Sequence, residues 1–119
     1  MIECPIKHTF QIVGKKFTVL ILRNMIQGGD TRFNQLLQIE GINAKVLSAR
    51  LKDMERVGII ERKVYPENPV RIEYTLTEKG LALEPILEQM ATYSMKYHAK
   101  EVFKDGKPRK FEQVYQFEY

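Results

Sequence analysis

A stripe of cationic and small side chains lies on one face of a helix predicted at about residues 44–57. At 100° per residue, this face carries Lys45, Ser48, Ala49, Lys52 and Arg56, and acidic residues only flank it. Long cationic side chains can reach the phosphates of a nucleic acid, and the small Ser48 and Ala49 allow close approach, so that Ser48 can touch base edges. A solvated polar face of any amphipathic helix would show the same pattern, so the stripe alone leaves both interpretations open.

The opposite face of this predicted helix is apolar. Leu47, Leu51 and Met54 fall close together there and are predicted to be buried. Arg50 also falls on the apolar side. We therefore expect its stem to pack and its guanidinium to find a carboxylate, which is a structural role.

The single cysteine is the second candidate for chemistry. Cys4 precedes Pro5 at the start of a predicted helix, where the helix dipole and nearby Lys7 favour the reactive thiolate. A small apolar residue in an interface is the alternative. With no second cysteine, only a bridge between subunits could form a disulfide.

Other kinds of chemistry find little support in the sequence. Cys4 and His8 are four residues apart, and His98 is the only other histidine. A metal site needs three or four well-placed ligands, so these residues are too few to predict one. No nucleophile triad or phosphate-binding glycine loop is present. We expect no catalytic residue, no metal and no cofactor.

Composition describes an ordinary globular domain. The chain has 119 residues, 44% hydrophobic and 29% charged, which favours one domain and excludes general disorder. No apolar run approaches the roughly 20 residues that a bilayer requires. The first residues do not resemble a secretory signal, and one cysteine fits a reducing compartment, so we expect a cytoplasmic protein.

The net charge of +4 is unevenly distributed. Residues 43–71 hold seven cations against four acids, and residues 96–110 hold six cations against two acids. The rest of the chain is therefore acidic overall. These two basic segments indicate an anionic partner or, more simply, a solvated surface.

Apolar spacing and chain-breaking residues define the other elements. Helices are predicted at about residues 5–13, 16–27, 34–39 and 44–57, with an extended stretch at 31–33. Two β-rich segments, 59–65 and 70–76, flank a tip that contains Pro66 and Pro69, and predict a hairpin. A last long helix follows Thr77, with a kink or break expected at Pro85.

The predicted fold is mostly α with a small β-hairpin, in the order helix, helix, strand, helix, helix, hairpin, long helix. This order is a winged helix-turn-helix, in which the helix at 44–57 enters a major groove and the hairpin, or wing, lies over adjacent backbone. The wing presents Arg62, Lys63, Asn68 and Arg71. A solvated strand face is the alternative for each of these residues.

Several segments in this order resemble the HxlR-type transcriptional regulators, within the MarR-like winged-helix proteins of prokaryotes. The resemblance covers about residues 4–94 and rests on residues 4–6, 14–22, 32–36, 42–47, 51–55, 58–62, 65–69, 71–77 and Gly80. Phe17 stands where this family usually has tryptophan, which is a packing change. The tail after about Tyr97 is longer than the family core.

The resemblance implies a homodimer that binds a pseudo-palindromic operator in double-stranded DNA. The helices at residues 44–57 of the two subunits would then lie about 34 Å apart. It places the first and last helices at the dimer interface, and the apolar stripe of the last helix agrees with this. The interface residues are then Ile6, Phe10, Ile86, Leu87, Met90, Tyr93 and Tyr97. Some family members sense oxidants through a cysteine at this place, so Cys4 becomes a candidate sensor.

The expected DNA contacts divide into two kinds. Lys45, Ser48 and Ala49 are expected at bases, beside Asn43 and Ala44 at the start of the helix. Phosphates are expected to contact Arg32, Lys52, Lys63 and Arg71, with Arg62 and Asn68 nearby on the wing.

Two questions stay open in the sequence. A winged-helix module for protein–protein contact is the alternative function, although such a helix would expose apolar or acidic residues in place of the stripe. Beyond the DNA-binding domain at 1–103 lies a basic, aromatic tail at 104–119. It is predicted either to extend the dimer interface through Phe111, Tyr115 and Phe117 or to follow DNA phosphates from Lys104 to Lys110.

Overall fold

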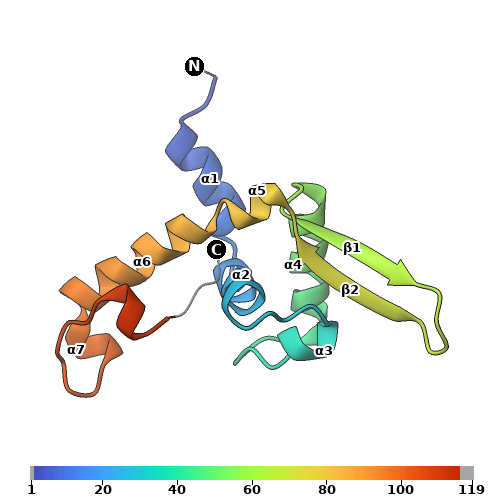
Figure 1. Ribbon diagram of the computed structural model, residues 1–119. Helices are drawn as coiled ribbons and strands as arrows, with labels where there is room; N and C mark the ends of the chain where they lie inside the picture. The colour runs from blue at the N-terminus through green and yellow to red at the C-terminus, as the bar shows by residue number, and fades with distance from the viewer. Residues whose placement is uncertain (1, 116–119) are drawn as a thin grey trace.

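A computed structural model describes residues 2–115 as a mainly helical fold with one two-stranded antiparallel sheet (Figure 1). The elements are α1 (Pro5–Val13), α2 (Thr18–Gln27), α3 (Phe33–Leu36), α4 (Ala44–Arg56), β1 (Ile60–Tyr65), β2 (Arg71–Leu76), α5 (Glu78–Leu81), α6 (Glu84–Tyr97), α7 (Ala99–Val102) and the 3-10 turn η1 (Phe111–Gln113). This confirms the predicted winged helix-turn-helix.

The core surrounds α2, as its apolar residues predicted. Ile21 and Leu22 are fully buried and belong to one cluster with the inner face of α4, which consists of Leu47, Leu51 and Met54. Gly58 follows the C-terminal end of α4 and has a φ of +83°, a left-handed backbone conformation that favours glycine. At Gly80 a side chain would overlap the carbonyl oxygen of Ile59, so the start of α5 lies directly against the residue that precedes β1.

The extended strand expected at residues 31–33 is not a strand, because α3 already begins at Phe33. The side-chain oxygen of Gln35 accepts hydrogen bonds from the backbone N–H groups of Thr31 and Arg32, each at 2.9 Å, and so caps the start of α3. Thr31 makes one sheet-like contact, since its carbonyl accepts from the Tyr74 N–H at 2.8 Å.

The last long helix is broken, as Pro85 predicted. Thr77 caps α5 by accepting a hydrogen bond from the Gly80 N–H, and α6 begins at Glu84 with Pro85 in its first turn. A second interruption at His98 separates α6 from α7.

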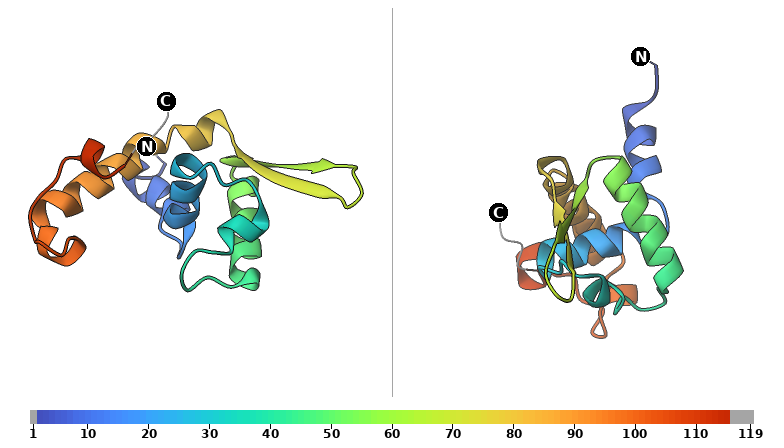
Figure 2. Two further views of the ribbon diagram at one scale, coloured as in Figure 1. Left: turned by 60° about the horizontal axis from the view of Figure 1, so that its bottom comes forward. Right: turned by 90° about the vertical axis from the view of Figure 1, so that its right-hand side faces the viewer.

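Three parts project from the helical body. The hairpin extends to one side, α1 leaves the body on its own, and α6 with the C-terminal segment extends away from the hairpin (Figures 1 and 2). The radius of gyration of 15.8 Å accordingly exceeds the roughly 13.5 Å expected for a rounded chain of this length. No helix within residues 2–115 is long and apolar enough to cross a membrane.

The C-terminal segment folds back on its own chain. After α7 it turns at Gly106, and η1 packs against α6 with Phe111 buried. Arg109 binds Asp105 at 2.8 Å and stacks on the ring of Phe103 at 3.9 Å. Phe111 and Tyr115 therefore pack against elements of their own chain, while Phe117 lies outside the described residues.

Candidate nucleic-acid interface

Helix α4 carries the predicted stripe on its outer side. Asn43 caps the helix by accepting a hydrogen bond from the Val46 N–H at 2.9 Å. The buried inner face then turns the opposite side to solvent. Lys45, Ala49, Lys52 and Arg56 are exposed, as are Asn43 and Ala44 at the helix start, and Ser48 is half-buried.

A polar clamp fixes α4 to the loop between α1 and α2. The Asp53 carboxylate accepts a hydrogen bond from the Lys15 ammonium at 3.1 Å and lies near the guanidinium groups of Arg56 at 3.0 Å and Arg50 at 3.6 Å. Arg50 also donates from Nε to the carbonyl of Lys16 at 2.8 Å. The structural role predicted for Arg50 is confirmed.

The clamp changes the acidity of its central carboxyl. The Lys15 hydrogen bond and charge lower the pKa of Asp53, and the charges of Arg56 and Arg50 add to the effect against the opposing influence of burial. Asp53 is therefore ionised at neutral pH, and its negative charge is matched by neighbouring cations.

The cations of α4 consequently fall into two groups. Arg56 shares its charge with Asp53. Lys45 and Lys52 form no ion pair with any residue in the described range 2–115, so their charges are available to an external anion. Both lie on the stripe, and no acid lies between them.

The cations of the wing also fall into a group without ion pairs and a group with them. Arg62 and Lys63 on β1 are exposed and form no ion pair within the described part of the chain, and Asn68 is exposed at the tip. Arg71 on β2 binds Glu67 and Glu73, each at 3.1 Å, and lies over the Tyr65 ring at 4.0 Å.

Arg32 extends this network from the start of α3. It lies 3.6 Å from the same Glu73 carboxylate that binds Arg71, and the neighbouring Thr31 carbonyl bonds the backbone of β2. Glu73 therefore joins α3 to the wing. Arg32 and Arg71 hold the wing in place, and their contact with phosphates stays a prediction.

The predicted interface residues lie on α1 and α6, and all but one of them are exposed. Ile6 and Phe10 on α1 are 82% and 67% exposed, and Ile86, Met90, Tyr93 and Tyr97 on α6 are exposed as well. Leu87 is only 8% exposed and belongs to the protein's own core, so it is not available to a partner. A mainly apolar groove of about 740 Å³ runs between α1 and α6 beside Phe10 and Met90.

Cys4 is exposed and stands at the N-cap of α1, where its side chain makes no capping hydrogen bond. His8, its candidate neighbour, bonds Glu3 at 3.1 Å. Within residues 2–115, no three His, Cys, Asp or Glu side chains gather in a way that could hold a metal ion.

Residues 12–102 match the HxlR-like helix-turn-helix family. The chain belongs to this family. It is 42% identical over 88 residues to an uncharacterized HTH-type transcriptional regulator of Synechocystis sp., a match that covers 73% of this chain and 64% of that protein. It is 39% identical over 93 residues to the HTH-type transcriptional regulator YodB of Bacillus subtilis, which covers 76% of this chain and 82% of YodB.

Solved structures of transcriptional regulators are also similar to this chain. The reduced form of YodB superposes with a TM-score of 0.69 at 35% identity, over 81% of this chain and 95% of that one. The reduced form of the redox regulator HypR gives a TM-score of 0.73 at 32% identity, over 86% and 99%. This HxlR-like protein is therefore a transcriptional regulator, its family implies DNA binding, and its relatives are regulators rather than enzymes.

The clamp at Asp53 and the shared Glu73 were missed by the sequence interpretation. Asp53 was seen only as a flank of the stripe, and Glu73 as part of a strand. The one available signal was Arg50 on an apolar face, which required a nearby acid. Asp53, three residues further on, is the carboxylate that it finds.

Proposed function

We propose that this HxlR-like protein binds a pseudo-palindromic operator as a homodimer and regulates transcription in the cytoplasm. Each protomer inserts α4 into a major groove and lays its wing over the adjacent backbone. The observation that carries the proposal is the exposed, acid-free stripe on α4, whose Lys45 and Lys52 have no ion pair among the described residues. A helix used for docking another protein would expose apolar or acidic side chains there.

The proposed DNA contacts follow from which side chains are exposed and which already form ion pairs within the protein. Lys45, Ser48 and Ala49 face bases beside Asn43 and Ala44, and Lys52 contacts phosphate. On the wing, Arg62, Lys63 and Asn68 reach the backbone of the DNA. Arg32 and Arg71 position the wing through Glu73 and add phosphate contact at their exposed edges.

The homodimer forms through α1 and α6. The exposed side chains of Ile6 and Phe10 lie at the same groove as Ile86 and Met90, and Tyr93 and Tyr97 extend this face along α6. Single exposed apolar residues are common on protein surfaces, but a set gathered on two neighbouring helices is typical of an interface. A two-fold axis through this face would pair the two α4 helices with two operator half-sites.

Regulation through Cys4 is a second part of the proposal. The thiol is exposed at the start of α1, one of the two proposed interface helices. YodB has been solved in reduced and diamide-treated forms, and HypR in reduced and oxidised forms. We infer that oxidants or electrophiles act at Cys4 and alter how the two protomers meet.

The test is a fluorescence-anisotropy titration of DNA from upstream of the protein's own gene at 50 mM and 200 mM salt. A protein that neutralises several phosphates should lose about a thousandfold or more in affinity between these conditions. Sedimentation of the complex should give two protomers for each duplex. No binding at 50 mM salt would contradict the proposal.

A further inference from the structure

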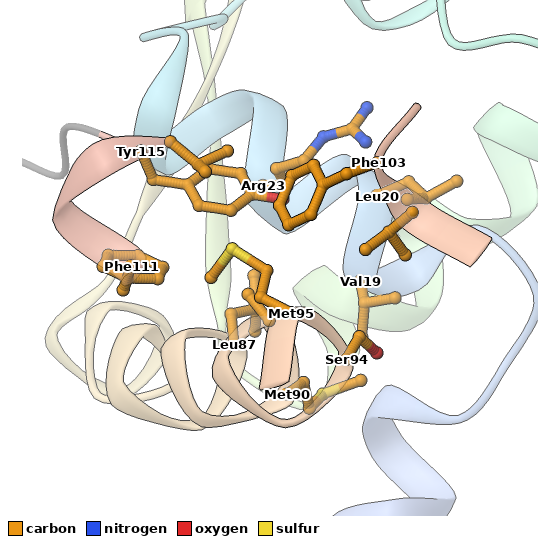
Figure 3. Close-up of a pocket in the computed structure, with 13 residues that line it drawn as sticks. Val19, Leu20, Arg23, Leu87, Met90, Ser94, Met95, Phe103, Phe111 and Tyr115 are labelled. Atoms are coloured by element: carbon orange, nitrogen blue, oxygen red, sulfur yellow. The ribbon is translucent and has the colours of Figure 1, made fainter. Parts of the chain in front are cut away.

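Two of the protein's cavities differ in the chemistry of their walls. The cavity between α2, α6 and the C-terminal segment has a volume of about 430 Å³, and apolar side chains such as Leu87, Met95 and Phe111 form most of its wall (Figure 3). A second cavity, of about 370 Å³, lies between α1, the loop after it, the C-terminal end of α4 and α5. We call it the junction pocket, and polar and charged residues form most of its lining.

Cations from three different elements line the junction pocket. Lys15 comes from the loop after α1, Arg56 from the last turn of α4, and Lys79 from α5. Asp53 is the only acidic lining residue in the described part of the chain, so the permanent charges of the lining amount to +2. His8, on α1, adds a further positive charge when it is protonated.

These cations have hydrogen-bond donors to spare. The Lys15 ammonium donates to the Asp53 carboxylate at 3.1 Å, and the Lys79 ammonium donates to the Val57 carbonyl at 2.6 Å. Arg56 reaches Asp53 through one terminal nitrogen at 3.0 Å. Since ammonium and guanidinium groups each carry several donors, the remaining ones on these exposed side chains are open to a ligand.

One carboxylate balances only part of the positive charge at the pocket. Asp53 is shared among Lys15, Arg56 and Arg50, and the hydrogen bond from Lys15 together with the three charges lowers its pKa. Lys79 forms no ion pair with any residue in the range 2–115, where its ammonium bonds a backbone carbonyl. The excess of positive charge favours an anion with several acceptor oxygens.

We propose that the junction pocket binds the phosphate group of a small phosphate monoester. Such a group carries about two negative charges near pH 7, which matches the charge of the lining. Lys15, Arg56 and Lys79 bind its oxygens. The pocket volume is within the range of small-molecule sites and is larger than the phosphate alone requires, so the organic part packs beside Gln11 and Ile12 of α1.

The ligand would also act on the clamp at Asp53, a consequence that rests on the proposed function. A bound phosphate competes with Asp53 for Lys15 and Arg56, so it weakens the link between the loop after α1 and α4. The pocket lies at the opposite end of α4 from Asn43, where the proposed base contacts begin. The ligand therefore changes DNA binding through the clamp and does not cover the DNA-binding stripe.

The test is a titration of the full-length protein, carrying ¹³C-methyl methionine, with ribose 5-phosphate, ribose and inorganic phosphate at low salt. Met54 lines the junction pocket, whereas Met95 lines the other cavity and is an internal control. Ribose 5-phosphate should shift the Met54 methyl saturably and leave Met95 unchanged. It should bind at least about tenfold more tightly than inorganic phosphate, and ribose should not bind.

Variants of the lining test where the phosphate binds. Lys79→Gln keeps a donor for the Val57 carbonyl and should lower the affinity for ribose 5-phosphate about fivefold, and Arg56→Gln, Lys79→Gln should lower it at least about tenfold. Lys100→Gln, Lys104→Gln removes two exposed cations outside the lining and should bind like the wild type. Urea unfolding confirms that each variant is folded.

Several results would overturn the proposal. An unchanged Met54 methyl at millimolar ribose 5-phosphate or an unchanged affinity in both lining variants would do so. An equal loss in Lys100→Gln, Lys104→Gln would show only an effect of net charge and would also overturn it. Inorganic phosphate that binds as tightly as ribose 5-phosphate would contradict the assignment to a monoester. Because no DNA is present, failure of operator binding and failure of this site are separate outcomes.

Discussion

The Lys15 ammonium donates a hydrogen bond to the Asp53 carboxylate across 3.1 Å, and this pair joins the loop after α1 to α4. Lys15 follows the helix that carries Phe10, a proposed interface residue. Asp53 lies one residue beyond Lys52, a proposed phosphate contact. The pair thus links the proposed dimer face to the proposed DNA-binding face, with Arg50 bonded to Lys16 as a second connection.

Removing the charge of Asp53 should weaken the fold. Asp53→Asn is expected to lower the free energy of unfolding by about 0.5–1 kcal/mol at pH 7, since the pair is partly exposed and screened. The pKa of Asp53 is lower in the folded protein, so its contribution is present above about pH 4 and is lost as the pH falls through that lowered pKa.

Urea unfolding at pH 7 and pH 3 measures this effect. Glu55→Gln is a matched control, because Glu55 is an exposed acid on the same helix and forms no ion pair with the described residues. A difference between wild type and Asp53→Asn that stays constant down to pH 3 would rule out the ion-pair explanation.

Two of the wing's three cations, Lys63 and Arg71, should behave differently when replaced. Lys63→Ala removes a free charge, so it should weaken binding to all DNA sequences and reduce the salt slope by about 0.9. Arg71→Ala should also weaken binding, and it should accelerate amide exchange in β1 and β2 because Glu67, Glu73 and Tyr65 lose their partner. If Arg71→Ala changed neither affinity nor salt slope, the wing would not contact DNA.

The apolar face of α1 should control association. Phe10→Glu places a charge on the proposed interface and should raise the dimer dissociation constant at least about tenfold, by sedimentation velocity. Val70→Glu is the control, since Val70 is comparably exposed but lies at the tip of the wing. Equal dimerisation in both variants would exclude α1 from the interface.

Cys4 should make DNA binding sensitive to oxidation. Diamide is expected to change operator affinity in the wild type and to leave Cys4→Ser unaffected, because the chain has no other thiol. Non-reducing electrophoresis would show whether two subunits become linked. The same diamide response in Cys4→Ser would exclude a role for this thiol.

The fold was largely predictable because its signals are local. The cap at Asn43, the apolar face of α4 and the two β-rich segments beside the proline-containing tip are each recognised from residues only a few positions apart. Prediction failed where distant segments meet. Leu87 shares the helical spacing of Met90 and Tyr97, and spacing alone cannot show that it faces α2 while they face outward.

The residues of the candidate site could be predicted from the sequence, but which of its cations form ion pairs within the protein could not. Sequence placed Lys45, Lys52 and Arg56 on one face, but only the packing of the loop at Lys15 beside α4 shows which cations are already neutralised. For the aromatic tail, the sequence predicted contact either with the partner subunit or with DNA phosphates, and did not predict contact with its own chain. Phe111 packs against α6 of its own chain, and this contact has no local signature.

The account is tested most directly by the affinity of the Lys45→Ala, Lys52→Ala double variant for its operator, measured across a salt series. We predict a loss of at least about a hundredfold at 100 mM salt and a shallower salt slope, with an unchanged midpoint of urea unfolding. The control is a Lys100→Ala, Lys104→Ala double variant, which also removes two cations and should bind the operator with the affinity of the wild type. Full operator affinity and an unchanged salt slope in the α4 variant would contradict the assignment of α4 as the DNA-binding helix.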